Sequence, residues 1–192
     1  MIVNMNIRSF IAIDLDETLK QLLKEFQVVL KKDGADCRWI NPDGIHITLK
    51  FLGNVEQEKI KSIEAGIEKA CRGSSSFKLS LKGLEAFYRR DRSGVIWINA
   101  EKKPALISLY EAIEEEMAGF RFKKEKRAFT PHVTLGRVSS ISNRYQLEKL
   151  MEQYKDKDFG SFMVKEVVLM KSDLRPEGAR YSRLAEIHLA SK

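Results

Sequence analysis

The stretch IHITLKFLG, residues 45–53, decides the fold, because its middle returns as HVTLGRV at residues 132–138. The chain has 192 residues and only three histidines, yet two of them open a His-x-Thr-Leu tetrapeptide. These two are His46 and His132, and they stand 86 residues apart. Self-similarity at a fixed distance along the chain indicates an internal repeat.

Each tetrapeptide has the alternation of a strand. Successive side chains of a strand point to opposite faces, so His46 shares a face with Thr48, and His132 shares one with Thr134. The residues between them are apolar. The pattern therefore predicts two strands that each bury an apolar back in a core and present an imidazole and a hydroxyl on the open side.

The repeat extends beyond the tetrapeptides, because both halves follow the order strand, helix, histidine-bearing strand, helix, strand. Asp16 or Thr18 can cap the first helix, and Pro104 can open the third. We expect helices through residues 19–30, 57–71, 104–119 and 143–154, and strands at 9–15, 45–52, 77–84, 95–100, 132–138, 162–170 and 181–189.

Two similar halves predict a bilobal α+β fold. We expect two pseudo-symmetric lobes of mostly antiparallel sheet, with helices on the outside and a central cleft between them. Each lobe would contribute one strand to the floor of this cleft. Residues 1–192 would form a single domain of two interleaved lobes, with repeat halves at about 8–86 and 94–190. A pseudo-twofold axis between the lobes would bring both imidazoles to one cleft.

The charge balance favours an anionic partner. The formal net charge is +7, from 34 Lys and Arg against 27 Asp and Glu, which suits nucleic acid or phosphate esters. No run of 18 apolar residues and no signal-peptide pattern occurs, so we expect a soluble cytoplasmic protein without a membrane partner. Cys37 and Cys71 form neither a C-x-x-C pair nor a disulfide framework, and we expect buried free thiols.

Two imidazoles that face one ligand can divide the work of an in-line displacement at phosphorus. One takes a proton from the attacking water and the other gives a proton to the leaving oxygen, and an ordinary pKa near 6.5 suits both roles. Thr48 and Thr134 can hydrogen-bond the phosphate oxygens, and Arg137 can oppose their charge. By strict alternation Arg137 points away from His132, so a bulge or a strand end must re-aim it.

Other sites fit the pattern less well. A single His-x-Thr strand more often holds a structural or exposed histidine, but the duplication argues against that for the pair. A zinc site needs three or four ligands, and neither tetrapeptide alternates its histidine with Cys, Asp or Glu. A serine hydrolase would need a Gly-x-Ser-x-Gly elbow, which is absent. His188 is expected to be an exposed strand residue that shares a face with Glu186.

Four stretches together resemble the 2H phosphoesterase superfamily, in its LigT-like branch of RNA 2',3'-cyclic phosphodiesterases, also called 2'-5' RNA ligases. They are RSFIAID at residues 8–14, the block at 39–53, PHVTL at 131–135 and SDLRPEGARY at 172–181. The resemblance covers essentially the whole chain. It implies the bilobal α+β fold and hydrolysis of a terminal 2',3'-cyclic phosphate on RNA to a 2'-phosphate, without a metal or a cofactor.

The resemblance also implies a role for each site residue. His46 would protonate the departing 3' oxygen, and His132 would activate water. Thr48 and Thr134 match the threonines that hold the phosphate, and the family's arginine falls on Arg137. At the equivalent offset the first motif has Phe51, so the site would be asymmetric.

The partner implied by the resemblance is RNA, bound by a monomer. Relatives also join tRNA halves reversibly through a 2'-5' linkage, and the sequence does not say which direction matters in the cell. Two rival functions stay open: a phosphodiesterase for small cyclic nucleotides or ADP-ribose cyclic phosphate, and a non-catalytic module that binds RNA ends. Further RNA contacts are expected from basic and aromatic residues outside the motifs, namely Arg89, Arg90, Arg92, Trp39, Phe87 and Tyr88.

Overall fold

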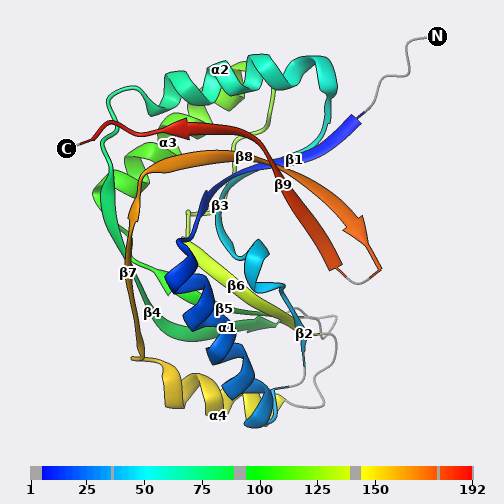
Figure 1. Cartoon of the computed structure of the whole chain (residues 1–192), viewed down its shortest axis with the longest axis vertical. Coiled ribbons are helices and arrows are strands. Elements are labelled where there is room, and N and C mark those ends of the chain that lie inside the picture. Colours follow the sequence, from blue (N-terminus) through cyan, green and yellow to red (C-terminus); the bar gives the residue numbers. More distant parts are fainter. Residues whose placement is uncertain (1–5, 36, 89–93, 139–143, 177, 192) are drawn as a thin grey trace.

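One continuous, mostly antiparallel sheet runs through the molecule (Figure 1). The computed structural model of the chain describes residues 6–35, 37–88, 94–138, 144–176 and 178–191, and within these ranges the sheet has nine strands. The strands are β1 (Asn6–Asp14), β2 (Arg38–Trp39), β3 (His46–Glu56), β4 (Phe77–Tyr88), β5 (Gly94–Ala100), β6 (His132–Val138), β7 (Asp158–Val164), β8 (Glu166–Arg175) and β9 (Gly178–His188).

The helices lie where the apolar spacing predicts them. They are α1 (Glu17–Lys32), α2 (Ile60–Cys71), α3 (Pro104–Gly119) and α4 (Arg144–Tyr154), with short 3-10 turns η1 (Pro42–Gly44) and η2 (Gln57–Lys59). Of the two possible caps for α1, Asp16 is the one used, because its Oδ1 accepts a hydrogen bond from the Leu19 amide at 2.8 Å. No helix within the described ranges is long and apolar enough to cross a bilayer.

The sheet divides into two wings. The strand order is β7-β4-β5-β6-β3-β1-β8-β9, with β2 paired to β6. The pairing of β3 with β6 consists of one residue pair, Ile47 opposite Val133, so the sheet is narrowest there. We call β3-β1-β8-β9 the first wing and β6-β5-β4-β7 the second wing. The two wings repeat one order of strands on either side of this seam, which confirms the predicted mostly antiparallel α+β fold.

The wings exchange strands. β4 belongs to the first half of the chain but pairs with β5 and β7 in the second wing, and β8 from the second half pairs with β1 in the first. Helices cover the outside in the same crossed manner, since α2 and α3 pack together over the first wing and α1 and α4 over the second (Figure 1). We therefore propose that residues 8–86 and 94–190 are two halves of an interleaved repeat.

One predicted strand is wrong in its extent. The sequence predicts a single strand over residues 162–170, but β7 ends at Val164 and β8 begins at Glu166. The chain leaves the second wing and enters the first between them, because β7 pairs with β4 and β8 pairs with β1. Lys165 and Glu166 interrupt the apolar residues at the crossing, but two polar residues also occur within single strands, so the pattern alone does not reveal it.

The two thiols were both expected to be buried. Cys71 is buried as expected, whereas Cys37 is only half-buried.

Candidate active site

The two His-x-Thr-Leu tetrapeptides meet at the seam between the wings. Ile47 and Val133, the residue pair that joins β3 to β6, are fully buried in the core. Because the strands are antiparallel, one step from this pair places the histidine of each tetrapeptide beside the threonine of the other. All four polar side chains lie on the face opposite the buried pair. The predicted convergence of the two motifs on one face is thus supported by the register.

Both imidazoles are held in the same way. Nδ1 of His46 lies 2.7 Å from the Gly44 carbonyl oxygen, and Nδ1 of His132 lies 2.7 Å from that of Thr130. A carbonyl oxygen can only accept, so Nδ1 carries the proton in each ring. Nε2 of each neutral ring is then the basic nitrogen, and in His46 it accepts the Thr48 hydroxyl at 3.0 Å. Two matched hydrogen bonds therefore turn both rings so that Nε2 is the reactive atom.

A bulge re-aims Arg137. Along β6, Gly136 lies opposite Ile96 and Thr134 lies opposite Trp97, which leaves Leu135 without a partner residue. The burial pattern changes phase at this point, and Arg137 is exposed. Arg137 therefore comes to the same face as the histidine and threonine of its motif, whereas strict alternation would have pointed it to the opposite face.

The first motif carries the same bulge. In β3, Lys50 lies opposite Ile11 and Thr48 opposite Ala12, so Leu49 is the extra residue. The first seven residues of β3 and those of β6 have one burial pattern. Phe51 is the sixth residue of β3, as Arg137 is the sixth of β6, so the bulge turns Phe51 to the same face as His46. Its side chain is 66% exposed. The site is symmetric in its backbone but carries a cation on one side and an aromatic ring on the other.

Aromatic rings surround His46. The ring of Phe10 lies 4.6 Å from the imidazole, and that of Tyr181 lies 5.2 Å away at nearly a right angle. Burial lowers the pKa of His46 below its usual 6.5. The bond to Gly44 and the charge of Asp14 act in the opposite direction, whereas charges on His132 and Lys20 lower the pKa further. His132 therefore lies close enough to His46 for its charge to lower the pKa of His46.

The residues opposite the two histidines differ in charge. Asp14 faces His46 across β1 and β3, and it forms ion pairs with Lys20 and Arg183. Asn99 faces His132 across β5 and β6. Its amide accepts from Trp97 Nε1 at 2.9 Å and donates to the Glu85 carboxylate at 2.7 Å. The sequence alone did not reveal this difference, because it depends on which strand pairs with each motif.

A groove of about 1250 Å³ is lined by Phe10 and Tyr181, the two rings that contact His46, although the histidines and threonines of the two motifs are not among its lining residues. Its walls come from β1, β3, the β2–η1 segment and the β8–β9 hairpin, and Arg137 reaches it from β6. Trp39, expected to contact RNA, lines this groove with its ring 5.5 Å from Lys31 Nζ. Four further arginines that the sequence did not single out also line it: Arg8, Arg38, Arg175 and Arg180.

The other predicted RNA contacts are not part of this groove. Arg89, Arg90 and Arg92 lie outside the described residues, as does the side chain of Tyr88. Phe87 is 54% exposed on β4 but does not line the groove. These five residues stay predictions without a place in the site.

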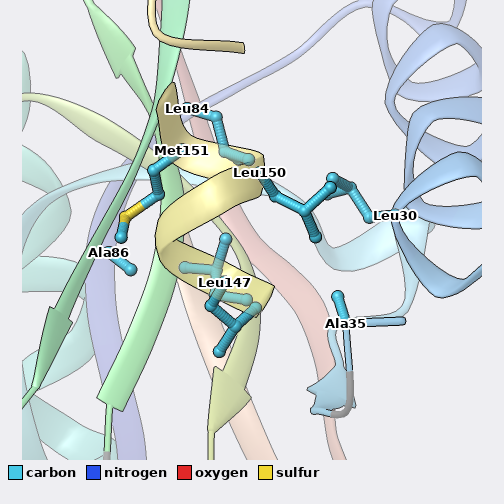
Figure 2. Close-up of a pocket in the computed structure, with 8 residues that line it drawn as sticks. Leu30, Ala35, Leu84, Ala86, Leu147, Leu150 and Met151 are labelled. Atoms are coloured by element: carbon cyan, nitrogen blue, oxygen red, sulfur yellow. The ribbon is translucent and has the colours of Figure 1, made fainter. Parts of the chain in front are cut away.

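A second, small hollow lies between α1, α4 and the second wing (Figure 2). Its lining is apolar, with Leu30, Leu84, Leu147, Leu150 and Met151 among the residues drawn. Nothing in it can transfer a proton or bind a phosphate, so it belongs to the core and not to a functional site.

One cluster has the composition of a metal site. Glu166, Glu186 and His188 bring their ligand atoms within 4.8 Å of one another. However, the guanidinium of Arg183 already contacts the two carboxylates, at 2.8 and 2.9 Å. His188 is exposed on β9 beside Glu186, as predicted. A cation of the protein is thus already paired with both carboxylates of this cluster, and neither of the two seam histidines belongs to it.

Known proteins resemble this chain over most of its length. A model of the 2'-5' RNA ligase superfamily matches residues 14–176. A protein of Methanocaldococcus jannaschii named RNA 2',3'-cyclic phosphodiesterase is 37% identical over 93% of this chain and 99% of its own length. A protein of the same name from Methanothermobacter thermautotrophicus is 32% identical over 96% of this chain and 100% of its own.

Solved structures share the fold. E. coli LigT complexed with 3'-AMP superposes with a TM-score of 0.77 at 26% identity, covering 96% of this chain and 98% of that one. The protein TT0787 of Thermus thermophilus gives a TM-score of 0.79 at 24% identity, covering 96% and 99%.

Proposed function

Because the chain belongs to the 2'-5' RNA ligase superfamily, we propose that it acts as an RNA 2',3'-cyclic phosphodiesterase that opens the terminal cyclic phosphate to a 2'-phosphate. One observation carries the proposal. Two His-Thr pairs meet on one face of the seam, and matched backbone hydrogen bonds to Nδ1 turn both imidazoles to use Nε2. Such a pair can take one proton and give another at a single phosphate.

In the proposed mechanism, water attacks phosphorus as Nε2 of His132 takes its proton. The bond from phosphorus to the 3' oxygen breaks, and the protonated His46 gives its Nε2 proton to that oxygen. The phosphate stays on the 2' oxygen, and His46 and His132 have exchanged protonation states. Protons return through solvent before the next cycle. No step needs a cofactor or a metal ion.

The position of the groove supports these roles. The leaving 3' oxygen remains part of the nucleoside, so the acid must lie on the side where the ribose and base are bound. The rings of Phe10, Phe51 and Tyr181 and most of the groove's other lining come from the first wing, which carries His46, while Arg38, Trp39 and Arg137 reach the groove from β2 and β6. His132 is then left to face the attacking water. The groove thus favours His46 as the acid, in agreement with the family resemblance.

Three side chains are proposed to hold the phosphate. Thr48 and Thr134 lie on the same face as the imidazoles, within the two tetrapeptides, and their hydroxyls can donate to the non-bridging oxygens. Arg137 reaches that face through the β6 bulge and can oppose the negative charge that grows there. Burial raises the pKa of the neighbouring Tyr181, and the positive charges of Arg137 and Arg8 oppose that shift. The positive charge of Arg137 is therefore close enough to act on Tyr181, the ring that contacts His46.

The product of a defined substrate tests the proposal. An oligoribonucleotide ending in a 2',3'-cyclic phosphate, incubated with the protein in EDTA, is expected to yield a 2'-phosphate end. The end group can be identified by its resistance to a phosphatase specific for 3'-phosphates and by NMR. A 3'-phosphate product would reverse the assigned leaving group. No turnover at all would favour a non-catalytic module that binds RNA ends.

The pH dependence tests the role of His46. As the acid, His46 must be protonated, and its pKa in the free protein lies below 6.5 because the ring is buried. Activity is lost as the pH rises through that pKa, so the alkaline limb of kcat/KM is expected below pH 6.5. A bound phosphate favours the imidazolium, which moves the limb of kcat to higher pH. An alkaline limb of kcat/KM clearly above pH 6.5 would contradict this role.

The same pair of histidines could run the step in reverse, with an RNA 5' hydroxyl in place of water. Microscopic reversibility would then give 2'-5' joining of RNA ends such as tRNA halves. We propose this as a second reaction of the same site in a monomeric protein.

A further inference from the structure

The two wings place different residues opposite the paired histidines. In an antiparallel pair, directly opposite residues share a face, with Cβ atoms about 4.5–5.5 Å apart. Asp14 on β1 is the partner of His46, and Asn99 on β5 is the partner of His132. Because β1 lies beside β3 as β5 lies beside β6, these positions are equivalent in the two wings. The repeat thus brings a carboxylate to one imidazole and an amide to the other.

Asp14 is held in place beside the imidazole. Its Oδ1 lies 3.0 Å from Lys20 Nζ, and its Oδ2 accepts a hydrogen bond from Arg183 Nη2 at 2.5 Å. The side chain is only 9% exposed, so solvent screens its charge little. Nδ1 of His46 is already bonded to the Gly44 carbonyl. Asp14 therefore acts on this ring by its charge and not by a hydrogen bond.

The cations beside Asp14 do not cancel its charge. They belong to one network of four carboxylates and two cations, namely Asp14, Glu17, Glu166, Glu186, Lys20 and Arg183. Arg183 contacts three of the carboxylates at 2.5–2.9 Å, and Lys20 contacts two at 3.0 and 3.2 Å. His188 adds a third positive charge only where it is protonated, 3.5 Å from Glu166. The network is negative in either case, which favours an imidazolium beside it.

Asn99 occupies the matching position without a charge. Its Oδ1 accepts a hydrogen bond from Trp97 Nε1 at 2.9 Å, and its Nδ2 donates to Glu85 at 2.7 Å. Glu85 lies on β4, one strand further from His132. The ring of Trp97 lies 5.6 Å from the His132 imidazole. The β5 residues opposite the histidine and threonine of the second motif are thus an amide and an indole, both neutral.

The backbone bonds do not distinguish the two imidazoles, whereas Asp14 does. Each Nδ1 bonds to a carbonyl at 2.7 Å, so this bond cannot make one ring the acid. Burial lowers the pKa of His46, and charges on His132 and Lys20 lower it further. A buried acid would thus lose its proton early without the opposing charge of Asp14. Tyr181, which also contacts the ring, stays neutral because burial raises its pKa.

We propose that Asp14 and Asn99 are positioning residues that assign the acid and base roles to the two histidines. The carboxylate of Asp14 keeps the proton on His46 until the leaving oxygen takes it. The neutral Asn99 leaves His132 free to accept a proton from water. The inference rests on the proposed function, and it explains how two imidazoles with the same backbone bond come to perform different steps.

Two variants that change one charge each test the inference through the pH profile of kcat/KM on an oligoribonucleotide with a cyclic phosphate end. Asp14→Asn removes the charge that favours the imidazolium of His46, so the alkaline limb should move to lower pH. Lys20→Met removes a cation that disfavours it, so this limb should move to higher pH. Relative to their plateaus, the two variants should differ at least about threefold in kcat/KM on the alkaline limb. Loss of packing alone would lower both profiles without moving the limbs apart.

The second wing allows the converse change. Asn99→Asp/Glu85→Gln puts a carboxylate opposite His132 and keeps a hydrogen bond between the two side chains, with donor and acceptor exchanged. A base beside a carboxylate keeps its proton to higher pH, so the acidic limb should move to higher pH. Glu85→Gln alone should not produce this shift. The matched control is Asp173→Asn on β8, where the side chain is 43% exposed and pairs with Lys171; both limbs should stay as in the wild type.

NMR titration of the imidazole signals measures the same charges without catalysis. The titration of His46 should move to lower pH in Asp14→Asn and to higher pH in Lys20→Met. A titration that stays in place, or that moves in the same direction in both variants, would overturn the inference and leave the proposed function intact. If the titrations moved as expected in a protein that opened no cyclic phosphate, the proposed function would be wrong while the effect of Asp14 on His46 stood.

Discussion

Alanine in place of His46 or His132 is expected to lower kcat for opening the cyclic phosphate by about 10²–10⁴-fold, the usual contribution of a general acid or base. Each imidazole handles one proton, and no other described histidine lies at the seam to replace it. KM should change little, because Thr48, Thr134 and Arg137 remain. Single-turnover kinetics on a cyclic-phosphate oligonucleotide measure the effect.

His188→Ala is the matched control, since it removes the same side chain from an exposed position on β9. It should keep wild-type kcat. The double variant of the two seam histidines should lose little more than either single variant, because residues that act as a unit are not additive. Full activity in either single variant would mean that the two imidazoles do not share one reaction.

Lys50→Met is expected to destabilise the protein by about 3–5 kcal/mol, the usual result of breaking a buried ion pair. Lys50 is 6% exposed, and its Nζ donates to Glu114 Oε1 at 2.6 Å and to the Lys123 carbonyl at 3.0 Å. The other carboxylate oxygen of Glu114 accepts the Glu125 amide at 2.9 Å. Without the lysine, a charged carboxylate would stay buried with no cation beside it. Urea unfolding measures the loss.

An exposed pair provides the control. Lys59 contacts Glu56 at 3.0 Å with side chains that are 62% and 42% exposed, so Lys59→Met should cost less than about 1 kcal/mol. The double variant Lys50→Met/Glu114→Leu should recover a large part of the lost stability, because it removes the stranded charge as well. Equal effects of Lys50→Met and Lys59→Met would show that the buried pair does not hold β3 to α3.

Local patterns predicted much of the fold. The alternation in each His-x-Thr-Leu tetrapeptide gave the correct faces, and Asp16 and Pro104 begin their helices as capping preferences require. These features depend on neighbours within a few residues. Arg137 was expected to reach the histidine face through a bulge or a strand end, and the structure has the bulge.

Features set by distant pairing could not be predicted. The chain crosses between wings at Lys165 because β7 and β8 have different partners, and the charged residues Lys165 and Glu166 do not by themselves show which strand each side pairs with. Asp14 beside His46 and Asn99 beside His132 follow from the register of two separate strand pairs. The groove arginines come from distant parts of the chain, so no local charge cluster marked them.

The dependence of rate on pH in the two histidine variants tests the central claim most directly. Wild-type protein should give a bell-shaped profile, whose acidic limb comes from a base that must be deprotonated and whose alkaline limb comes from an acid that must be protonated. We predict that His132→Ala loses the acidic limb and His46→Ala loses the alkaline limb, each at a much lower rate. A complete bell in both variants would contradict the division of proton transfer between these two imidazoles.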